Sequence, residues 1–262
     1  MQYARIIYSV NDKIANIILN VPDKMNAIDN MMAVEILAAL KDAEHDERVR
    51  AVVFTGSGRS FCAGGDIEEM LEVIDAEYYT KAATAHSLCN IALFIKKMTK
   101  PVIASVFGAV AGAGFTLAAA CDFLIATDDT RFMPAFAKMG LIPDAGGMYI
   151  LLRALGNKRT VQSVMSTDII TAEQGYEWGF VYKVCNREDL LDETDKLSSK
   201  LADGPGMSYK FVKELEYAVD YRGFEDYLKL EEKRQVECIS SDDHLEGIRA
   251  FREKRQPVFK GI

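Results

Sequence analysis

The sequence predicts an α/β domain built on a mostly parallel sheet. Between residues 50 and 127, patterns of buried strands alternate with helical patterns, as they do in parallel sheets. Within this region the stretch between Lys100 and Asp122 carries no charge and contains three glycines, so it should be buried and should allow close backbone approach. After about residue 187 only helical patterns remain. At 262 residues, the chain can form one large domain or a domain with an appendage.

Local patterns assign the first elements. In order, they are a β-hairpin (6–10 and 14–19), a loop (21–30), a helix (31–44) and a buried strand (50–55). The hairpin is expected because two alternating apolar runs flank three polar residues. Asp29 or Asn30 can cap the helix, whose apolar residues recur at helical spacing. The strand has four successive apolar residues from Ala51, typical of burial on both faces.

A glycine-rich loop, GSGRSFCAGGD, follows that strand. Asp66 and Glu69 form a D-x-x-E capping pattern, so a helix should begin at Ile67, and helical sequence should continue to about Met98. The uncharged stretch then predicts a strand (101–107), a loop and a helix (113–121), because its first part is β-branched and its second part rich in alanine. Its length suggests a membrane span, but the initial proline and the glycines argue against one.

The remaining elements alternate less regularly. They are a strand (123–127), an extended segment (130–132), helices (145–155 and 171–179), a strand (181–185) and four further helices (188–202, 206–219, 223–239 and 242–254). The clearest break is DGPG at 203–206, and the composition changes between about 187 and 205. We therefore expect a core at 1–195 and a helical region at 196–262.

Composition excludes several classes of function. The net charge of −8 provides no basic surface for nucleic acid. Five widely spaced cysteines without a CxxC motif indicate reduced thiols and a cytoplasmic protein, and the first residues lack a signal-peptide pattern. The three histidines show no metal-ligand spacing, so no metal site is predicted. Neither glycine-rich loop matches a P-loop or a dinucleotide-binding fingerprint.

The two glycine-rich loops are more informative together than singly. Each alone is equally well explained by tight turns and close packing. However, each follows a buried strand and leads into a helix, whose first N–H groups are unpaired and lie at the positive end of the helix dipole. Two such N–H groups aimed at one point stabilise a developing oxyanion. We therefore predict that both loops contribute to an oxyanion hole for a thioester.

Several motifs resemble the crotonase superfamily of enoyl-CoA hydratases and isomerases, in order and over essentially the whole chain. They are MNA (25–27), FCAGGDIEEM (61–70), the stretch 101–122, GLIPDAGGMYILLRALG (140–156), TAEQGYEWGFV (171–181) and FREKRQPVF (251–259). The resemblance implies a spiral of ββα units with a C-terminal helical trimerisation region. It also implies a homotrimer or a dimer of trimers acting in fatty acid metabolism on an acyl-CoA thioester, with no cofactor beyond the coenzyme A of the substrate.

The resemblance also implies site residues. The thioester oxygen would lie between the N–H groups of Gly65 and Ala113. Residues implied in binding substrate or coenzyme A are Lys24, Asn26, Ala27, Ala63, Asp66, Ile67, Thr116, Phe136, Phe251 and Lys254. Of these, the loop at 24–27 and the backbone at 66–67 would line the adenine pocket, and the two residues of the last helix would reach coenzyme A in their own or a neighbouring subunit. Simple solvation explains Lys24 and Lys254 equally well.

The chain departs from the hydratase pattern at two positions. Typical hydratases hold and activate water with two glutamates, where this chain has Thr116 and Phe136. An acid remains at Asp144, in LIPDAGG, where hydratases usually have glycine. This arrangement resembles the ring-1,2-epoxyphenylacetyl-CoA isomerase and Δ3,Δ2-enoyl-CoA isomerase subgroup, in which the aspartate is the base. Asp144 can alternatively cap the helix expected from Ala145.

Apolar neighbours could suit Asp144 to proton transfer near neutral pH by raising its pKa through desolvation. The candidate neighbours are Phe136, Leu141, Ile142 and Met148. The sequence thus predicts an isomerase that converts 3-enoyl-CoA to 2-enoyl-CoA, with Asp144 carrying the proton and no metal or redox cofactor. Three alternatives stay open: a ring-1,2-epoxyphenylacetyl-CoA isomerase using the same site, a weak hydratase using Asp144 and Thr116, and a non-catalytic protein that binds CoA esters.

Overall fold

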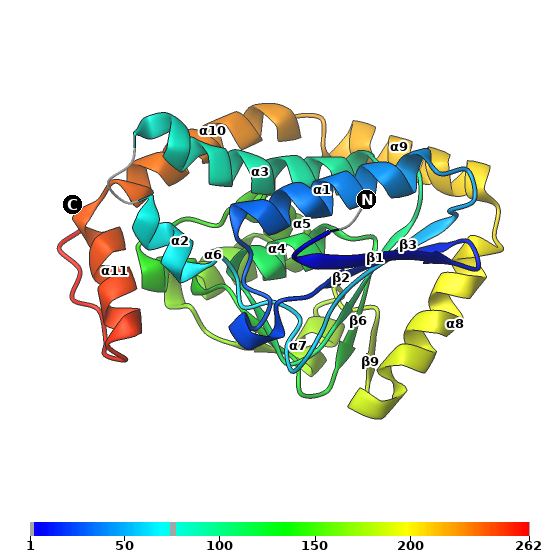
Figure 1. Ribbon diagram of the computed structural model, residues 1–262, viewed down its shortest axis with the longest axis horizontal. Coiled ribbons are helices and arrows are strands. Elements are labelled where there is room, and N and C mark those ends of the chain that lie inside the picture. Colours follow the sequence, from blue (N-terminus) through cyan, green and yellow to red (C-terminus); the bar gives the residue numbers. More distant parts are fainter. Residues whose placement is uncertain (1–2, 74–76, 262) are drawn as a thin grey trace.

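The computed structural model describes residues 3–73 and 77–261 (Figure 1). The helical sequence predicted over 67–98 forms two helices, α2 (Ile67–Glu72) and α3 (Tyr78–Lys97). The middle of that prediction, residues 74–76, lies outside the described residues.

A six-stranded sheet forms the centre of the molecule. Its strands, in spatial order, are β1 (Ile6–Asn11), β2 (Ile14–Leu19), β3 (Ala51–Gly56), β4 (Val102–Val106), β6 (Phe123–Thr127) and β9 (Lys183–Cys185). The β1–β2 hairpin is antiparallel and the other neighbouring strands are parallel. A smaller sheet consists of β5 (Ala109–Ala111), β7 (Arg131–Met133) and β8 (Ile170–Thr171), in that order. The predicted α/β class, hairpin and mostly parallel sheet are confirmed.

Helices cover both faces of the large sheet. On one face lies α1 (Asn30–His45), and α3 packs between α1 and α10 (Phe224–Ile239), as Figure 1 shows. On the other face α8 (Leu190–Ala202) packs against β3, β4 and β6. The side chains of β3 alternate accordingly. Val52 and Phe54 belong to the larger core, and Ala51 and Val53 belong to the core under α8. This explains the continuous apolar run of the strand.

The remaining helical segments connect these layers. They are η1 (Pro22–Lys24), α4 (Gly112–Ala120), η2 (Ala135–Met139), α5 (Gly147–Leu155), α6 (Asn157–Ser166), α7 (Ala172–Glu177), η3 (Arg187–Asp189), α9 (Gly206–Asp220) and α11 (Asp242–Arg252). Helix α6 is not predicted by the sequence analysis, because its N-cap, Gly156, provides no side-chain hydrogen bond that would mark its start. Helix α8 runs across the expected division at 195, which stays a prediction. None of the helices that the structure describes is long and apolar enough to cross a membrane.

Two aspartates cap α1 and α2. Asp29 accepts the Met32 N–H at 2.7 Å at the start of α1. Asp66 accepts the N–H groups of Glu68 at 2.9 Å and Glu69 at 3.4 Å, so the predicted start of α2 at Ile67 is confirmed. The Glu69 carboxylate, the other member of the predicted D-x-x-E pattern, accepts the Asn30 N–H at 3.0 and 2.9 Å. It thereby joins α2 to the start of α1.

Candidate active site

The two glycine-rich loops lie against each other. The Cys62 N–H donates to the Ala109 carbonyl at 3.1 Å, and the Ala111 N–H donates to the Cys62 carbonyl at 2.9 Å. A side chain at Gly114 is excluded, because its Cβ would lie 2.6 Å from the Cys62 Sγ. Gly112 has φ 49° and its Cβ position lies 3.6 Å from the Gly64 Cα. Glycine therefore permits the close approach that the sequence indicated.

Gly65 and Ala113 follow these two contact points. Neither N–H donates to another group among the described residues, and Ala113 lies in the first turn of α4, where N–H groups have no partner within the helix. A Cβ on Gly65 would lie 2.4 Å from the Met70 Cε, so a side chain here would require the end of the Met70 side chain to move. The two N–H groups without partners thus lie on loops that touch each other, although they are about 50 residues apart in the sequence.

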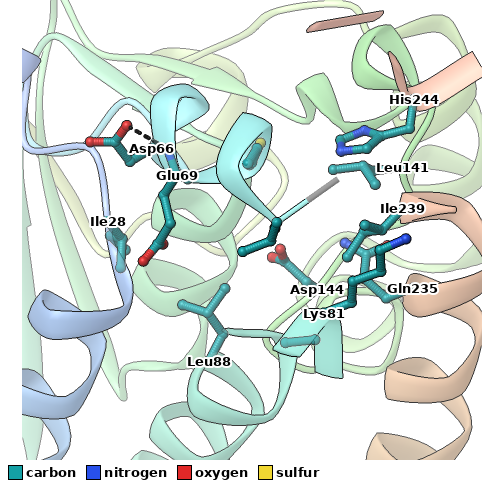
Figure 2. Close-up of a pocket in the computed structure, with 14 residues that line it drawn as sticks. Ile28, Asp66, Glu69, Lys81, Leu88, Leu141, Asp144, Gln235, Ile239 and His244 are labelled. Atoms are coloured by element: carbon teal, nitrogen blue, oxygen red, sulfur yellow. Dashed lines mark hydrogen bonds between the residues drawn. The ribbon is translucent and has the colours of Figure 1, made fainter. Parts of the chain in front are cut away.

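A cavity of about 50 Å³ lies beside Gly65. Its lining residues are Ile28, Gly65, Asp66, Glu69, Met70, Val73, Lys81, Ala85, Leu88, Leu141, Asp144, Gln235, Ile239 and His244. Most of the surface that faces the cavity is apolar. Figure 2 shows Asp144 near the middle of this lining, with Glu69 and Asp66 on one side and Leu141, Ile239 and His244 on the other.

Asp144 does not cap a helix, so the alternative that it serves only as an N-cap is wrong. Helix α5 begins at Gly147, and its N-cap is Gly146, without a side-chain hydrogen bond. Ala145 and Gly146 both have left-handed backbone, with φ of 55° and 75°. A Cβ on Gly146 would lie 2.4 Å from the Phe224 ring. This turn places Asp144 three residues before the start of α5, and its side chain faces the cavity.

The surroundings of Asp144 favour its protonated form. Its Oδ1 atom is buried and accepts no hydrogen bond from the described residues. Burial, and secondly the negative charge of Glu231, raise the pKa of Asp144 to about 8, and a contact with the Gln235 amide acts in the opposite direction. The predicted direction of the pKa shift is therefore confirmed, and Leu141 is the predicted neighbour that shares the cavity lining.

Glu231 of α10 is a site residue that the sequence analysis missed. It is only 2% exposed, and its Oε1 accepts the Gly146 N–H at 2.8 Å. The Tyr227 hydroxyl donates to its Oε2 at 2.7 Å, and the Cys89 thiol donates to Oε1 at 3.4 Å. The available signal was helical spacing, because Glu231 lies on the buried stripe with Leu228 three residues before it.

The two positions where hydratases have glutamate lie close to this site but add no carboxylate to it. Thr116 is fully buried on α4, and its Oγ1 has no hydrogen-bond partner among the described residues. Phe136 of η2 is 5% exposed, and its ring lies 3.8 Å from the Cβ position of Gly112. Neither side chain lines the cavity.

The residues predicted for the adenine pocket gather around Asp66. Lys24 Nζ contacts Asp66 Oδ2 at 2.5 Å. The Ala63 N–H donates to the Met25 carbonyl at 2.9 Å, and Ala27 and Ile67 are partly exposed beside this contact. Burial alone would raise the pKa of Asp66, but hydrogen bonds from Lys24 and from the first N–H groups of α2 lower it.

Asn26 holds this loop in shape. It is fully buried; its Oδ1 accepts the Val21 N–H at 2.9 Å, and its Nδ2 donates to the carbonyls of Ser57 and Ser60 at 2.9 Å each. With both ends of the amide occupied, the loop can offer a ligand the backbone of this residue. Phe251, at the end of α11, is 60% exposed, and the exposed Lys254 follows the helix; neither lines the cavity of its own chain.

Comparison with known proteins agrees with this geometry. The family model described as enoyl-CoA hydratase/isomerase matches residues 9–262. The chain is 38% identical to trans-2-decenoyl-[acyl-carrier-protein] isomerase of Streptococcus mutans over all of both chains, and 33% identical to 1,2-epoxyphenylacetyl-CoA isomerase of Escherichia coli over 98% of each. An enoyl-CoA hydratase structure from Mycobacterium avium superposes with a TM-score of 0.90 at 28% identity, covering 99% of this chain and 100% of that one. The crotonase resemblance is thus confirmed, and the chain belongs to the enoyl-CoA hydratase/isomerase family.

Proposed function

We propose that this enzyme is an enoyl-thioester isomerase that moves a double bond from C3–C4 to C2–C3. The observation that carries the proposal is Asp144. It faces the cavity beside Gly65, its Oδ1 has no partner among the described residues, and its pKa is raised to about 8. A carboxyl group that titrates near neutral pH is suited to take a proton from carbon and return it.

The reaction needs one proton and one anionic intermediate. The thioester oxygen accepts hydrogen bonds from the N–H groups of Gly65 and Ala113. Asp144 removes a proton from C2, and the electron pair of that C–H bond passes into a dienolate whose charge lies largely on the thioester oxygen. The two N–H groups and the positive end of α4 stabilise this charge, and losing one such donor costs about 3–4 kcal/mol. Asp144 then returns the proton to C4, which leaves the double bond at C2–C3.

Hydration is a weaker candidate because the cavity offers one free carboxyl group. Addition of water in the hydratase mechanism uses two glutamates, and Thr116 and Phe136 replace them here. Two other acids line the cavity, but Asp66 caps α2 and contacts Lys24, and Glu69 accepts the Asn30 N–H. Their oxygens are already engaged, which supports isomerisation by Asp144 alone.

Coenzyme A is the carrier we propose. In support of it, residues 24–27, Ala63 and residues 66–67 gather at the entrance loops, where the backbone of Ala27 and Ile67 could contact an adenine ring. The related protein from S. mutans is named for an acyl-carrier-protein substrate, and both carriers present the acyl group on a phosphopantetheine arm. Assaying the same acyl group on both carriers distinguishes them.

Ring-1,2-epoxyphenylacetyl-CoA isomerisation is the second candidate, since the E. coli relative bears that name and the same aspartate would serve. The cavity measures about 50 Å³, whereas an engineered protein cavity that admits benzene measures about 150 Å³. Either a six-carbon linear chain or an aromatic acyl group would therefore require Met70 or a neighbouring side chain to move.

The homotrimer, or dimer of trimers, also belongs to the proposal. Helix α9 leaves an apolar stripe uncovered in the single chain, formed by Met207, Phe211, Val212, Leu215 and Val219, each 49–79% exposed. A stripe of this kind on the last helices fits a contact between copies. In such an assembly Phe251 and Lys254 would be available to a neighbouring site. Light scattering after size exclusion tests the assembly, and a monomer at micromolar concentration would contradict it.

The decisive experiment compares two assays on wild type and Asp144→Ala. We expect wild type to isomerise 3-hexenoyl-CoA and to hydrate crotonyl-CoA poorly. In the variant, kcat/KM for isomerisation should fall about 10³-fold, the scale of general acid–base catalysis. Brisk hydration that survives the substitution would refute the mechanism. Binding of CoA esters without turnover of either substrate would favour a non-catalytic binding protein.

A further inference from the structure

Helix α5 takes its N-terminal cap from a distant part of the chain. The first N–H groups of any helix lack partners within the helix. At α5 the local cap is Gly146, which has no side chain to fill this role, and the Gly146 N–H donates to Glu231, 85 residues further along the sequence. Without Glu231, Asp144 would be the nearest carboxylate able to turn toward these donors.

We propose that Glu231 is a positioning residue of the site, which occupies the N-terminus of α5 and so keeps the Asp144 carboxyl group free and directed into the cavity. This inference rests on the proposed function of Asp144 as acid and base. Glu231 itself does not line the cavity, so it acts through the turn and through its charge.

The geometry of the turn supports this assignment. Ala145 is fully buried with φ of 55°, a left-handed backbone conformation that is unfavourable for a residue with a side chain. The hydrogen bond from Gly146 to Glu231 fixes the residue that follows it, at 2.8 Å. Tyr227 and Cys89 hold the Glu231 carboxylate from α10 and α3, so the acceptor is itself fixed. The position of Asp144 is thereby fixed by the hydrogen bond of Gly146, two residues further along the backbone.

The charge of Glu231 reaches Asp144 as well. Titratable and charged groups that face the pair come from every surrounding element: Tyr227 of α10, Cys89 and Lys81 of α3, Cys62 of the first glycine-rich loop, His244 of α11, and Glu69 of α2 across the cavity. Burial raises the pKa of both thiols and lowers that of His244, so these three are neutral near pH 7. Burial also raises the pKa of Glu231, to about 7, so Glu231 becomes ionised just below the pH range in which Asp144 titrates, and its negative charge then raises the pKa of Asp144.

The test is a direct titration of Asp144 by ¹³C NMR on protein labelled at aspartate carboxyl carbons, with the resonance assigned by its loss in Asp144→Asn. In Glu231→Gln, which keeps shape and one acceptor but loses the charge, the midpoint should move about one pH unit toward acid. Tyr227→Phe should move it in the same direction by less, because loss of this donor weakens the ionised form of Glu231. The matched control is Glu232→Gln, which removes a charge from the next position of α10, where the carboxylate pairs with His86; it should leave the midpoint unchanged.

Kinetics provide the second readout. Glu231→Ala, which removes the acceptor of the Gly146 N–H as well as the charge, should lower kcat about tenfold to a hundredfold with little change in KM, the scale expected when a catalytic group is misplaced by about 1 Å. An unchanged Asp144 midpoint in a folded Glu231→Gln protein, or equal shifts in Glu231→Gln and Glu232→Gln, would overturn the inference. Because the titration needs no substrate, it tests Glu231 even if wild type fails to isomerise an enoyl thioester, the result that would defeat the proposed function.

Discussion

Two aspartates that line the same cavity each lie just before a helix, and they have opposite environments. Asp66 caps α2, contacts Lys24, and has a lowered pKa. Asp144 precedes α5 by three residues, caps nothing, and has a pKa raised to about 8. The difference arises from which carboxylate accepts the N–H groups at the start of each helix. At α2 the local aspartate does so, whereas at α5 Glu231 does so from another helix. The second arrangement leaves a buried carboxyl group for chemistry.

The largest effect expected from this contrast is on the pH dependence of catalysis. In the free enzyme only the ionised form of Asp144 can accept the C2 proton, so kcat/KM should rise with pH and level off above an apparent pKa of about 8. At pH 6 it should lie about 100-fold below the plateau. Asp66→Asn should retain this profile, since Asp66 is already ionised across the range. Initial rates on 3-hexenoyl-CoA between pH 6 and 9 check this, and a flat profile would remove Asp144 as the base.

The contrast was only partly predictable from sequence. Strand patterns such as 50–55 identify the sheet, and the glycines of the two loops identify their close approach at Gly64 and Gly112, because both follow from local periodicity and steric needs. The roles of Gly65 and Ala113 come from the crotonase resemblance and stay a prediction. Asp144 could also be found, as an acid in a distinctive motif. Its freedom from capping could not, since that depends on the pairing of Gly146 with Glu231. In sequence Glu231 lies within KLEEKRQVE, which resembles a solvated helix face.

A second test of the comparison is the free energy of unfolding. It should rise when Asp144 is replaced by asparagine and fall when Asp66 is. The pKa of Asp144 in the folded protein lies above its unfolded-state value of about 3.9. The stability that Asp144 contributes is therefore fully present below about pH 3.9 and is lost as pH rises toward 8. Asp144→Asn should therefore stabilise the fold, by about 5 kcal/mol at pH 9 and by about 1.5 kcal/mol at pH 5.

The pKa of Asp66 is lowered in the folded protein. The stability that Asp66 contributes is therefore present above its unfolded-state pKa and is lost only as pH falls through its folded-state pKa. Asp66→Asn should cost about 1 kcal/mol at pH 7, because asparagine can still cap α2 but loses the negative charge that faces Lys24 and the first N–H groups of the helix. Urea unfolding of both variants at pH 5, 7 and 9, at one protein concentration, measures the two signs. Destabilisation by Asp144→Asn at pH 9 would contradict the raised pKa of Asp144.

The smallest expected effect concerns Lys24, whose ammonium is about half exposed while its partner Asp66 is buried. Because Asp66 keeps the N–H groups of Glu68 and Glu69 when Lys24 is removed, Lys24→Met should leave α2 in place and kcat unchanged. KM for an acyl-CoA should rise about threefold at low salt, and less at high salt, since exposed charges are screened. Lys13→Met is the matched control, as Lys13 forms an exposed pair with Asp203 at 2.8 Å and does not line the cavity. A fall in kcat on losing Lys24 would mean that Asp66 depends on its lysine, and that the two aspartates differ in charge pairing rather than in how their helices are capped.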